Sequence, residues 1–436
     1  MSLIGVLCSD NEINNIISEE FEKGDRTAYI LHFPTTEQEI MEFLNFDLPE
    51  IVIINFSDRT IDLEPIIEQI KTDSWLHNFG IVGIYDREEQ KEETLHQKLK
   101  DLNVLSFLDK QRLRSHIYKS VQIIDQNRQI IFHRDLSEKL VDNLTGSFVI
   151  DNDIMSVSVY AGIAATILSQ RGYINPDAKM HLQLCLAELI VNGVEHGNCG
   201  ITFEEKSEGL EQGKSVVELV EEKCQSPDVA RKRVYMEWEI SNDATKFVIK
   251  DEGEGFDVTR LKEKIEKEGP FSLHGRGIRM ARMFAHKLYY NRKGNKVIIL
   301  IKHQNREART TPEGFSSEEV LYTKNGDVIF NEGEGSDFLY YISSGTYNVY
   351  HNDRIVGKLG PEDIFMGEMS FLLNNRRSAA VKAESEGRLV KISRRSFITV
   401  VKDYPHYGIF LSKLIARKLV RANTRNATEE AISSSL

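Results

Sequence analysis

The sequence has little of what marks secreted, membrane-spanning or nucleic-acid-binding proteins. Its four cysteines form no CxxC pair, and this usage indicates a reducing cytoplasm. No apolar run approaches the roughly 18 residues that a membrane-spanning helix needs. The formal net charge of -12 argues against a nucleic-acid groove, because the phosphate backbone would be repelled. We therefore expect a cytoplasmic protein that binds neither nucleic acid nor membrane.

What is present is the composition of a soluble globular protein. The chain is 41% hydrophobic and 28% charged, which excludes a disordered chain, and its 436 residues exceed one ordinary domain. The opening residues MSLIGVLCSD lack a basic n-region, so a buried first strand is a better interpretation than a lipoprotein signal. We expect two to four domains.

Residues 1–125 alternate short β-branched runs with helical patterns. This alternation predicts a doubly wound, flavodoxin-like parallel sheet wrapped by helices. The predicted strands are LIGVLCSD, TAYILHF, EIVIINFSD, FGIVGIYD and VLSFLDK, and the predicted helices include TTEQEIMEFLNF and EPIIEQIK.

The order of these elements resembles a response-regulator receiver domain. Lys110 matches that family, but Asn55 stands where the phosphorylated aspartate is expected, and an amide cannot form an acyl phosphate. Tyr85 replaces the expected Ser/Thr, and Ser9–Asp10 offers one carboxylate instead of an acidic pair. The resemblance implies a pseudo-receiver that docks or dimerises without being phosphorylated. The alternative, phosphorylation of nearby Asp58, requires a shifted loop.

A charged helical connector is predicted next, from about 110 to 140, with residues 126–145 as the linker proper. The second domain is predicted over 146–305. Within it, residues 200–232 form an insertion rich in Glu, Lys and Gly, which is either a solvated helical flap or a partner-docking element.

The stretch AELIVNGVEHGN places Glu188, Asn192 and His196 at four-residue intervals, which line one face of a helix. Its other face is apolar and predicts a core contact. Two further motifs follow, VIKDEGEGFD and LHGRGIRMARMFA. In this order, the three motifs resemble the N, G1 and G2 boxes of the GHKL ATPase fold, an α/β sandwich.

The resemblance implies that the domain binds ATP with Mg²⁺. Asn192 offers an amide oxygen to Mg²⁺, and Asp251 can accept a hydrogen bond from the adenine amine. Glu188 is the expected catalytic base. His196 lines the phosphates or satisfies the helix end, two alternatives that the sequence leaves open.

The glycines of both boxes have expected tasks. Gly253 and Gly255 let the backbone pass close to the nucleotide. Gly275 and Gly277 open a helix N-terminus that receives phosphates, with positive charge from Arg276 nearby. Residues 256–273 are the expected mobile lid.

The layout of residues 147–303 looks most like the anti-sigma-factor serine kinases. This implies transfer of the ATP γ-phosphate to a serine on a STAS-type anti-anti-sigma partner, and the family leads us to expect a homodimer. One alternative is an ATP-gated adaptor or anti-sigma factor that sequesters a partner, such as a sigma factor, without phosphoryl transfer. Another is a degenerate histidine kinase that uses His133.

Residues 315–436 carry short strands with regular glycines, which predict an antiparallel β-roll, and an amphipathic helix YGIFLSKLIARKLVRA. Residues 364–383 resemble the phosphate-binding cassette of cyclic-nucleotide-binding domains. By this resemblance, Gly367 gives backbone room, Glu368 binds the ribose hydroxyl of cAMP or cGMP, and Arg377 contacts the cyclic phosphate. The same cup is completed by Ser378 and Ala379.

Three positions depart from the usual cassette, namely Met366, Arg376 and Ala380. A structural relic that has lost its ligand is therefore the alternative.

The whole chain is predicted to be a multidomain α/β and α+β protein, in which the sensor and the first domain flank an ATPase and bias its lid.

Overall fold

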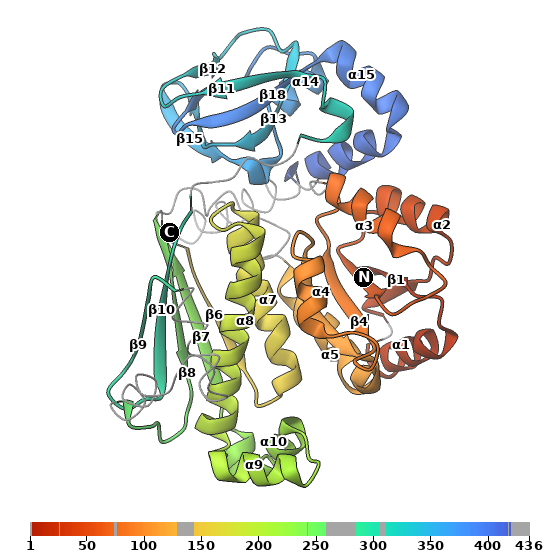
Figure 1. Cartoon of the computed structure of the whole chain (residues 1–436). Helices are drawn as coiled ribbons and strands as arrows, with labels where there is room; N and C mark the ends of the chain where they lie inside the picture. Colours follow the sequence, from red (N-terminus) through yellow and green to blue (C-terminus); the bar gives the residue numbers. More distant parts are fainter. Residues whose placement is uncertain are drawn as a thin grey trace, which may run out of the picture.

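The computed structural model describes residues 2–25, 27–73, 76–128, 144–241, 243–258, 285–304, 311–416 and 418–419. It is a multidomain α/β protein, and Figure 1 shows a group of elements around each of two large sheets and a separate β-roll. Among the helices described, none is both long and apolar enough to span a membrane.

The first sheet has five parallel strands in the order β2-β1-β3-β4-β5. All five predicted strands are confirmed, and β3, β4 and β5 are buried along their whole length, as continuous apolar runs in a covered parallel sheet should be. The strands are β1 (Ser2–Leu7), β2 (Tyr29–His32), β3 (Ile51–Asn55), β4 (Gly80–Tyr85) and β5 (Val104–Asp109). The helices are α1 (Asn11–Lys23), α2 (Glu37–Glu42), α3 (Leu63–Thr72), α4 (Glu92–Lys98) and α5 (Leu113–Gln126).

The helix predicted from about 110 is confirmed over 113–126, but this part of it packs in a core and does not act as a connector. Residues 113–126 form α5, which belongs to the first domain because Leu113, Ile117, Val121 and Ile124 are fully buried in its core. The charged residues that suggested a connector lie between these apolar positions. Residues 129–143 of the predicted linker are outside the described residues, and strand β6 begins at Leu144.

The second sheet is antiparallel, with the order β6-β7-β8-β10-β9. Helices α7 (Ile154–Gln170) and α8 (Pro176–Asn192) lie between this sheet and the first domain (Figure 1). The strands are β6 (Leu144–Ile150), β7 (Val234–Ile240), β8 (Ala244–Lys250), β9 (Lys287–Tyr290) and β10 (Lys296–Lys302).

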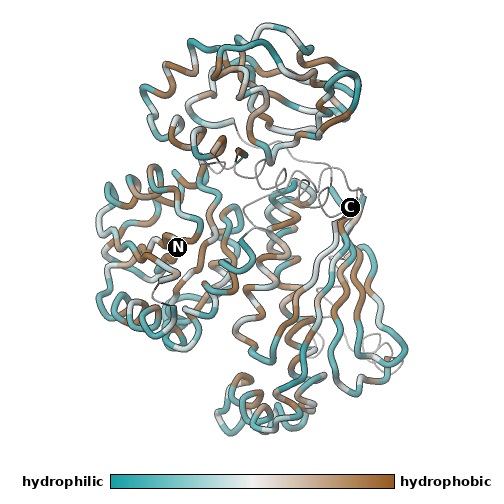
Figure 2. The backbone as a smooth tube through the Cα atoms, turned by 180° about the vertical axis from the view of Figure 1, so that it is seen from behind, coloured by the Kyte–Doolittle hydropathy of each residue, from teal (hydrophilic) through white to brown (hydrophobic). Residues whose placement is uncertain are grey.

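Helix α7 joins the two domains into one hydrophobic core. It is apolar on all sides, and a helix of that kind must be buried on all sides. Gly162 allows its close approach to β5, since a Cβ there would lie 2.1 Å from the Leu105 carbonyl oxygen. Lys119 of α5 pairs with Asp151 and Asp153, each at 2.8 Å. Figure 2 shows hydrophobic residues concentrated along the strands and helices that meet here.

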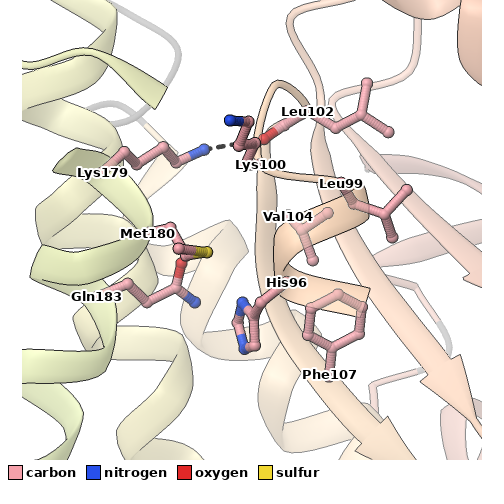
Figure 3. Close-up of a pocket in the computed structure, with 9 residues that line it drawn as sticks. All are labelled: His96, Leu99, Lys100, Leu102, Val104, Phe107, Lys179, Met180 and Gln183. Carbon is pink, nitrogen blue, oxygen red and sulfur yellow. Dashed lines mark hydrogen bonds between the residues drawn. The ribbon is translucent and has the colours of Figure 1, made fainter. Parts of the chain in front are cut away.

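The N-terminal half of α8 is attached to the first domain (Figure 3). Lys179 Nζ donates to the Leu102 carbonyl oxygen at 3.0 Å, the bond drawn dashed in Figure 3. It also donates to Asn103 Oδ1 at 3.3 Å, while Gln183 Nε2 donates to the Leu105 carbonyl oxygen at 3.2 Å. Burial lowers the pKa of Lys179 to about 8. Because α8 carries the predicted ATP-site residues at its other end, the position of the first domain bears directly on that site.

The insertion is helical, as predicted. Helices α9 (Phe203–Glu211) and α10 (Val216–Lys223) each begin with a capping box, and α11 (Pro227–Ala230) follows. This unit lies at the end of the second domain opposite the β-roll (Figure 1). Leu219 of α10 packs against Gly209 of α9, so the insertion has its own apolar contact.

The β-roll predicted for the third domain is present as two four-stranded sheets, β11-β18-β13-β16 and β12-β17-β14-β15. The predicted amphipathic helix is confirmed over residues 405–416, where Leu411 is buried. The strands are β11 (Glu319–Thr323), β12 (Val328–Phe330), β13 (Phe338–Ser344), β14 (Tyr347–His351), β15 (Arg354–Leu359), β16 (Phe365–Met366), β17 (Ala380–Ala383) and β18 (Gly387–Ser393), with helices α14 (Glu368–Leu373) and α15 (Arg394–Asp403).

The β-roll is attached to the first domain through helix 405–416. Tyr407 Oη donates to Asp73 Oδ1 at 2.8 Å, and Lys413 Nζ donates to the Asp47 carbonyl oxygen at 2.8 Å. Leu76 of the first domain belongs to the hydrophobic core of the β-roll. The first domain therefore contacts both the second domain and the β-roll.

Candidate nucleotide-binding sites

The polar stripe predicted on α8 is present. Glu188 is exposed and Asn192 half-buried, while Leu189 and Ile190 on the other face are buried. The helix begins at an Asn175 cap followed by Pro176 and widens into a π-turn over Gly193–Asn198. The two predicted site residues thus share the last turns of a helix that is buried on its opposite face.

His196 lies in the π-turn and is occupied locally. Its Nδ1 is 2.7 Å from the Ile201 carbonyl oxygen, and its Nε2 is 3.3 Å from Glu195 Oε1. Because both ring nitrogens have neighbours within this turn, the geometry favours the alternative in which His196 satisfies the helix end. The side chain is nevertheless exposed.

Two side chains of opposite charge, Lys206 and Glu195, lie near Glu188, and the sequence analysis missed both. Glu195 is 1% exposed and pairs with Lys206 of the insertion at 2.8 Å. Desolvation raises the pKa of Glu188; the charge of Lys206 opposes this rise and that of Glu195 adds to it. A carboxyl with a raised pKa is better suited to accept a proton near neutral pH. The only sequence signal for Lys206 was its place early in the charged insertion.

Asp251 follows directly after the last residue of β8 and faces the π-turn. Its Oδ1 accepts the Gly253 N–H at 2.9 Å, and desolvation raises its pKa. A Cβ on Gly197 would lie 2.4 Å from Asp251 Cγ, and a Cβ on Gly253 would lie 2.2 Å from the Gly197 carbonyl oxygen. The N-box and G1-box turns therefore fit together only because both carry glycine.

Gly255 has a positive φ of 79°, and a Cβ there would lie 2.0 Å from the Lys293 carbonyl oxygen. This close approach needs glycine on conformational and steric grounds. Asn295 supports the same turn, because its side chain donates to the Asp251 carbonyl oxygen at 3.3 Å. The predicted role of this segment near a nucleotide is compatible with its tight backbone.

Asn198 is a supporting residue that sequence reasoning missed. Its Oδ1 accepts the Glu252 N–H at 2.8 Å, and its Nδ2 donates to Asn152 Oδ1 at 2.9 Å. Asn198 is 1% exposed, so these bonds satisfy a buried amide and tie the G1 turn to α8. A polar residue directly after the glycine of the N box was the available signal.

The G2 residues Gly275, Arg276 and Gly277 lie outside the described residues, as does most of the predicted lid. Within the part of the chain that the structure describes, no cluster of three His, Cys, Asp or Glu is placed to hold a metal ion. Mg²⁺ commonly takes one or two protein oxygens and completes its shell with phosphates and water. A half-buried amide oxygen on Asn192 fits that donor requirement.

In the first domain, the structure places an amide, not a carboxylate, at the position that the resemblance to receiver domains singled out. Asn55 is buried, and its Nδ2 donates to Cys8 Sγ at 3.4 Å. The Asp58 carboxylate accepts hydrogen bonds from the N–H and hydroxyl of Ser9, at 2.5 and 2.8 Å, and from two further backbone N–H groups. Although burial opposes it, these bonds lower the pKa of Asp58.

The cassette residues of the β-roll are brought together. Gly367 has a positive φ of 77°, and a Cβ there would lie 2.2 Å from Arg377 Nη1. Arg377 is 3% exposed, donates to the Gly367 carbonyl oxygen at 2.8 Å and to Ser370 Oγ at 3.0 Å, and lies over the Phe330 ring. Its guanidinium is thus engaged with the protein in this structure.

The other cassette residues lie close by. Glu368 pairs with Lys418, at 2.5 Å, from the C-terminal helical segment. Ser378 is exposed and Ala379 half-buried, immediately before β17. For the predicted ligand contacts, Glu368 would exchange Lys418 for a ribose hydroxyl and Arg377 would turn toward the phosphate.

Comparison with known proteins identifies two domains. Residues 152–301 match the model of the histidine kinase-like ATPase domain, and residues 320–404 match the cyclic nucleotide-binding domain. The chain is 35% identical over 80 residues to a cGMP-dependent protein kinase of Plasmodium berghei (strain Anka), covering 18% of this chain and 9% of that protein.

Two further relatives show the same kind of partial match. Identity is 39% over 72 residues to the cAMP-dependent protein kinase type II regulatory subunit of Drosophila melanogaster, covering 16% of this chain and 19% of that protein. It is 30% over 107 residues to the CRP-like cAMP-activated global transcriptional regulator of Mycobacterium tuberculosis, covering 23% and 47%. The chain spans less than half the length of these relatives.

Among solved structures, the Thermus thermophilus catabolite activator protein matches with 25% identity and a TM-score of 0.25, covering 27% of this chain and 57% of that one. The family models and the geometry agree on the content of the chain. It contains a histidine kinase-like ATPase domain followed by a cyclic nucleotide-binding domain.

Proposed function

We propose that this protein is an ATP-dependent serine kinase of the anti-sigma-factor type that phosphorylates a STAS-like partner under control of its cyclic-nucleotide domain. The observation that carries the proposal is the placement of Glu188 and Asn192 on the last turns of α8, whose π-turn fits against Asp251. In this proposal, the base, the metal ligand and the adenine acceptor lie on two turns that pack against each other.

In the proposed mechanism, Glu188 removes the proton from the serine hydroxyl of the partner as that oxygen attacks the γ-phosphate. Asp251 accepts a hydrogen bond from the adenine amine and so fixes the base in the pocket. Asn192 would hold Mg²⁺ through its amide oxygen, and the bound metal would supply positive charge that neutralises the phosphates. The desolvation that raises the pKa of Glu188 favours its role as proton acceptor.

Phosphoryl transfer separates this proposal from its alternatives. Glu188→Gln should abolish transfer of labelled phosphate to a STAS-type protein while ATP affinity, measured by calorimetry, stays within about twofold of wild type, because the amide keeps the shape but not the basicity. Normal transfer by this variant would exclude Glu188 as the base. ATP binding without any transfer in the wild-type chain would favour the ATP-gated adaptor.

The degenerate histidine kinase predicts acid-labile phosphohistidine at His133, which lies outside the described residues. His133→Ala serves as the matched control. Autophosphorylation that persists in this variant would dismiss the histidine-kinase alternative.

For the remaining parts of the chain, we propose three domains over 1–125, 146–305 and 315–436 with a connecting segment at 126–145. The first is a pseudo-receiver, supported by its strand order and by a buried Asn55 in place of an aspartate. The expectation of a cytoplasmic homodimer is tested by light scattering of the purified protein.

Control by cAMP or cGMP has a physical route through the first domain. The β-roll holds this domain through Tyr407 and Lys413, and the domain in turn holds the catalytic helix through Lys179 and Gln183. Binding regulates transfer only if the ligand favours one arrangement of these contacts over another. Arg377→Glu should abolish binding of cyclic nucleotide in calorimetry, whereas unchanged affinity would favour a ligand-free relic.

A further inference from the structure

A continuous row of hydrogen bonds joins the insertion to the G1 turn. Asn152 Nδ2 donates at 2.9 Å to the carbonyl oxygen of Val229, which lies in α11 at the end of the insertion. Asn152 Oδ1 accepts from Asn198 Nδ2 at 2.9 Å. Asn198 Oδ1 accepts the Glu252 N–H at 2.8 Å. These two side-chain amides, which we call the amide relay, connect the insertion to the residue next to Asp251.

Both amides of the relay are buried, and each can point only one way. Asn152 is 7% exposed and Asn198 is 1% exposed. In each side chain the nitrogen donates toward the insertion, and the oxygen accepts from the side of the G1 turn. Turning either amide over would bring two donors or two acceptors together, and buried polar groups without partners are costly. A displacement of the Val229 carbonyl must therefore shift the relay or break it.

The last residues of the insertion hold Glu252 by a second route. The Arg233 N–H, directly after the insertion, donates to Glu252 Oε2 at 2.7 Å. Lys232 Nζ donates to the Asn198 carbonyl oxygen at 3.1 Å. The Arg233 guanidinium donates to the carbonyl oxygens of Ala230 and Lys232, both at 2.8 Å, and so fixes this end of the insertion. The backbone N–H and the carboxylate of Glu252 are thus both bonded to groups that are attached to the insertion.

The outer helices of the insertion form one unit with this end. Leu219 of α10 packs against Gly209 of α9. Lys223 Nζ also joins the two helices, because it donates to Glu205 Oε1 at 2.8 Å. The Ser226 N–H donates to the Lys223 carbonyl oxygen at 3.2 Å, so only a tight turn separates α10 from α11. A partner that displaces α9 and α10 would therefore also displace α11 and the start of the relay.

We propose that the insertion controls nucleotide binding by the second domain, and that Asn152 and Asn198 are the positioning residues through which it acts. This inference rests on the proposed function, because it concerns the same ATP site. Neither amide needs to touch the nucleotide. Together they place Glu252 and thereby orient the Asp251 carboxylate, the expected acceptor of the adenine amine. Because couplings between binding sites are reciprocal, a nucleotide at Asp251 must also stabilise the insertion.

Hydrogen exchange of the full chain tests this coupling from the side of the insertion. Exchange at residues 219–232 is measured by mass spectrometry, with and without a saturating concentration of a non-hydrolysable ATP analogue and Mg²⁺. In the wild type, we expect the analogue to slow exchange at these residues roughly fivefold or more.

Asn152→Ala removes the donor to the insertion, while Asn198 keeps its bond to Glu252. We expect this variant to lose most of the slowing at 219–232 and, by reciprocity, to bind the analogue more weakly by a similar factor in calorimetry. Asn55→Ala is the matched control, since it removes a buried amide that lies outside the relay, in the first domain. It should behave as the wild type in both measurements.

Unchanged exchange at 219–232 in a wild-type chain that binds the analogue would overturn the inference and leave the proposed function standing. This wild-type measurement decides the point even if a variant fails to fold. Equal slowing in Asn152→Ala and Asn55→Ala would exclude the amide relay as the route. A wild type that binds no analogue would overturn both the inference and the proposed function, whereas slowing without phosphoryl transfer would uphold the inference alone.

Discussion

Replacing Lys179 with methionine will remove a pH-dependent part of the stability of the junction between the first domain and α8. Lys179 is 6% exposed, and its ammonium donates to neutral oxygens of Leu102 and Asn103. Burial lowers its pKa from 10.5 to about 8. The charged form is therefore less stable in the folded chain than in the unfolded chain.

The unfolded chain keeps the Lys179 proton between about pH 8 and pH 10.5, where the folded chain has released it. The contribution of this residue is therefore most unfavourable below about pH 8 and improves as the pH rises toward 10.5. At about 1.4 kcal/mol for each pH unit that separates the two pKa values, the whole gain is about 3 kcal/mol. About 2 kcal/mol of it falls between roughly pH 7.5 and 10.

Urea unfolding at the two pH values, followed by Trp238 fluorescence in a Trp75→Phe background, measures this gain. We expect the stability of the wild type to increase by about 2 kcal/mol relative to Lys179→Met across the window. Lys100→Met is the matched control, because Lys100 lies on the same junction and its pKa is raised by Asp177, so it stays charged throughout. Equal pH dependence in wild type and Lys179→Met would refute the reasoning.

Two further substitutions test the contacts around the sites. Gly197→Ala places a methyl group 2.4 Å from Asp251 Cγ, so ATP affinity in calorimetry should fall roughly tenfold or more, whereas Gly335→Ala, with its nearest neighbour at 3.5 Å, should bind normally. Tyr407→Phe removes a donor from the buried Asp73 carboxylate and should cost about 1–3 kcal/mol, seen as faster proteolytic release of the β-roll. The exposed Tyr322→Phe should behave as wild type, and equal proteolysis of the two variants would contradict the docking role of Tyr407.

The polar stripe on α8 could be predicted because helical periodicity is a local property. Glu188 and Asn192 face away from Leu189 and Ile190 whatever the rest of the chain does. The strands of the first sheet were equally readable, since runs such as Ile51–Asn55 must be buried on both faces. The glycines of the G1 turn predicted a tight backbone. The sequence did not show which neighbouring atoms come too close for a side chain there.

The contacts across domains could not be predicted in the same way. Helix α5 was interpreted as a connector because its charged residues are conspicuous, and only packing against the first sheet shows which of its faces is buried. Lys179 and Lys206 looked like ordinary surface charges in the sequence. One is buried beneath the first domain, and the other pairs with a buried glutamate next to the proposed catalytic base.

By itself, then, the amino-acid order determined the periodic faces, the glycine turns and the two nucleotide-binding motifs, since these depend on residues near one another along the chain. Tertiary structure decided that the first domain contacts α8, and what Arg377 and Glu368 contact. Those outcomes depend on packing between segments far apart in sequence, where burial and charge are set by neighbours that no local pattern specifies.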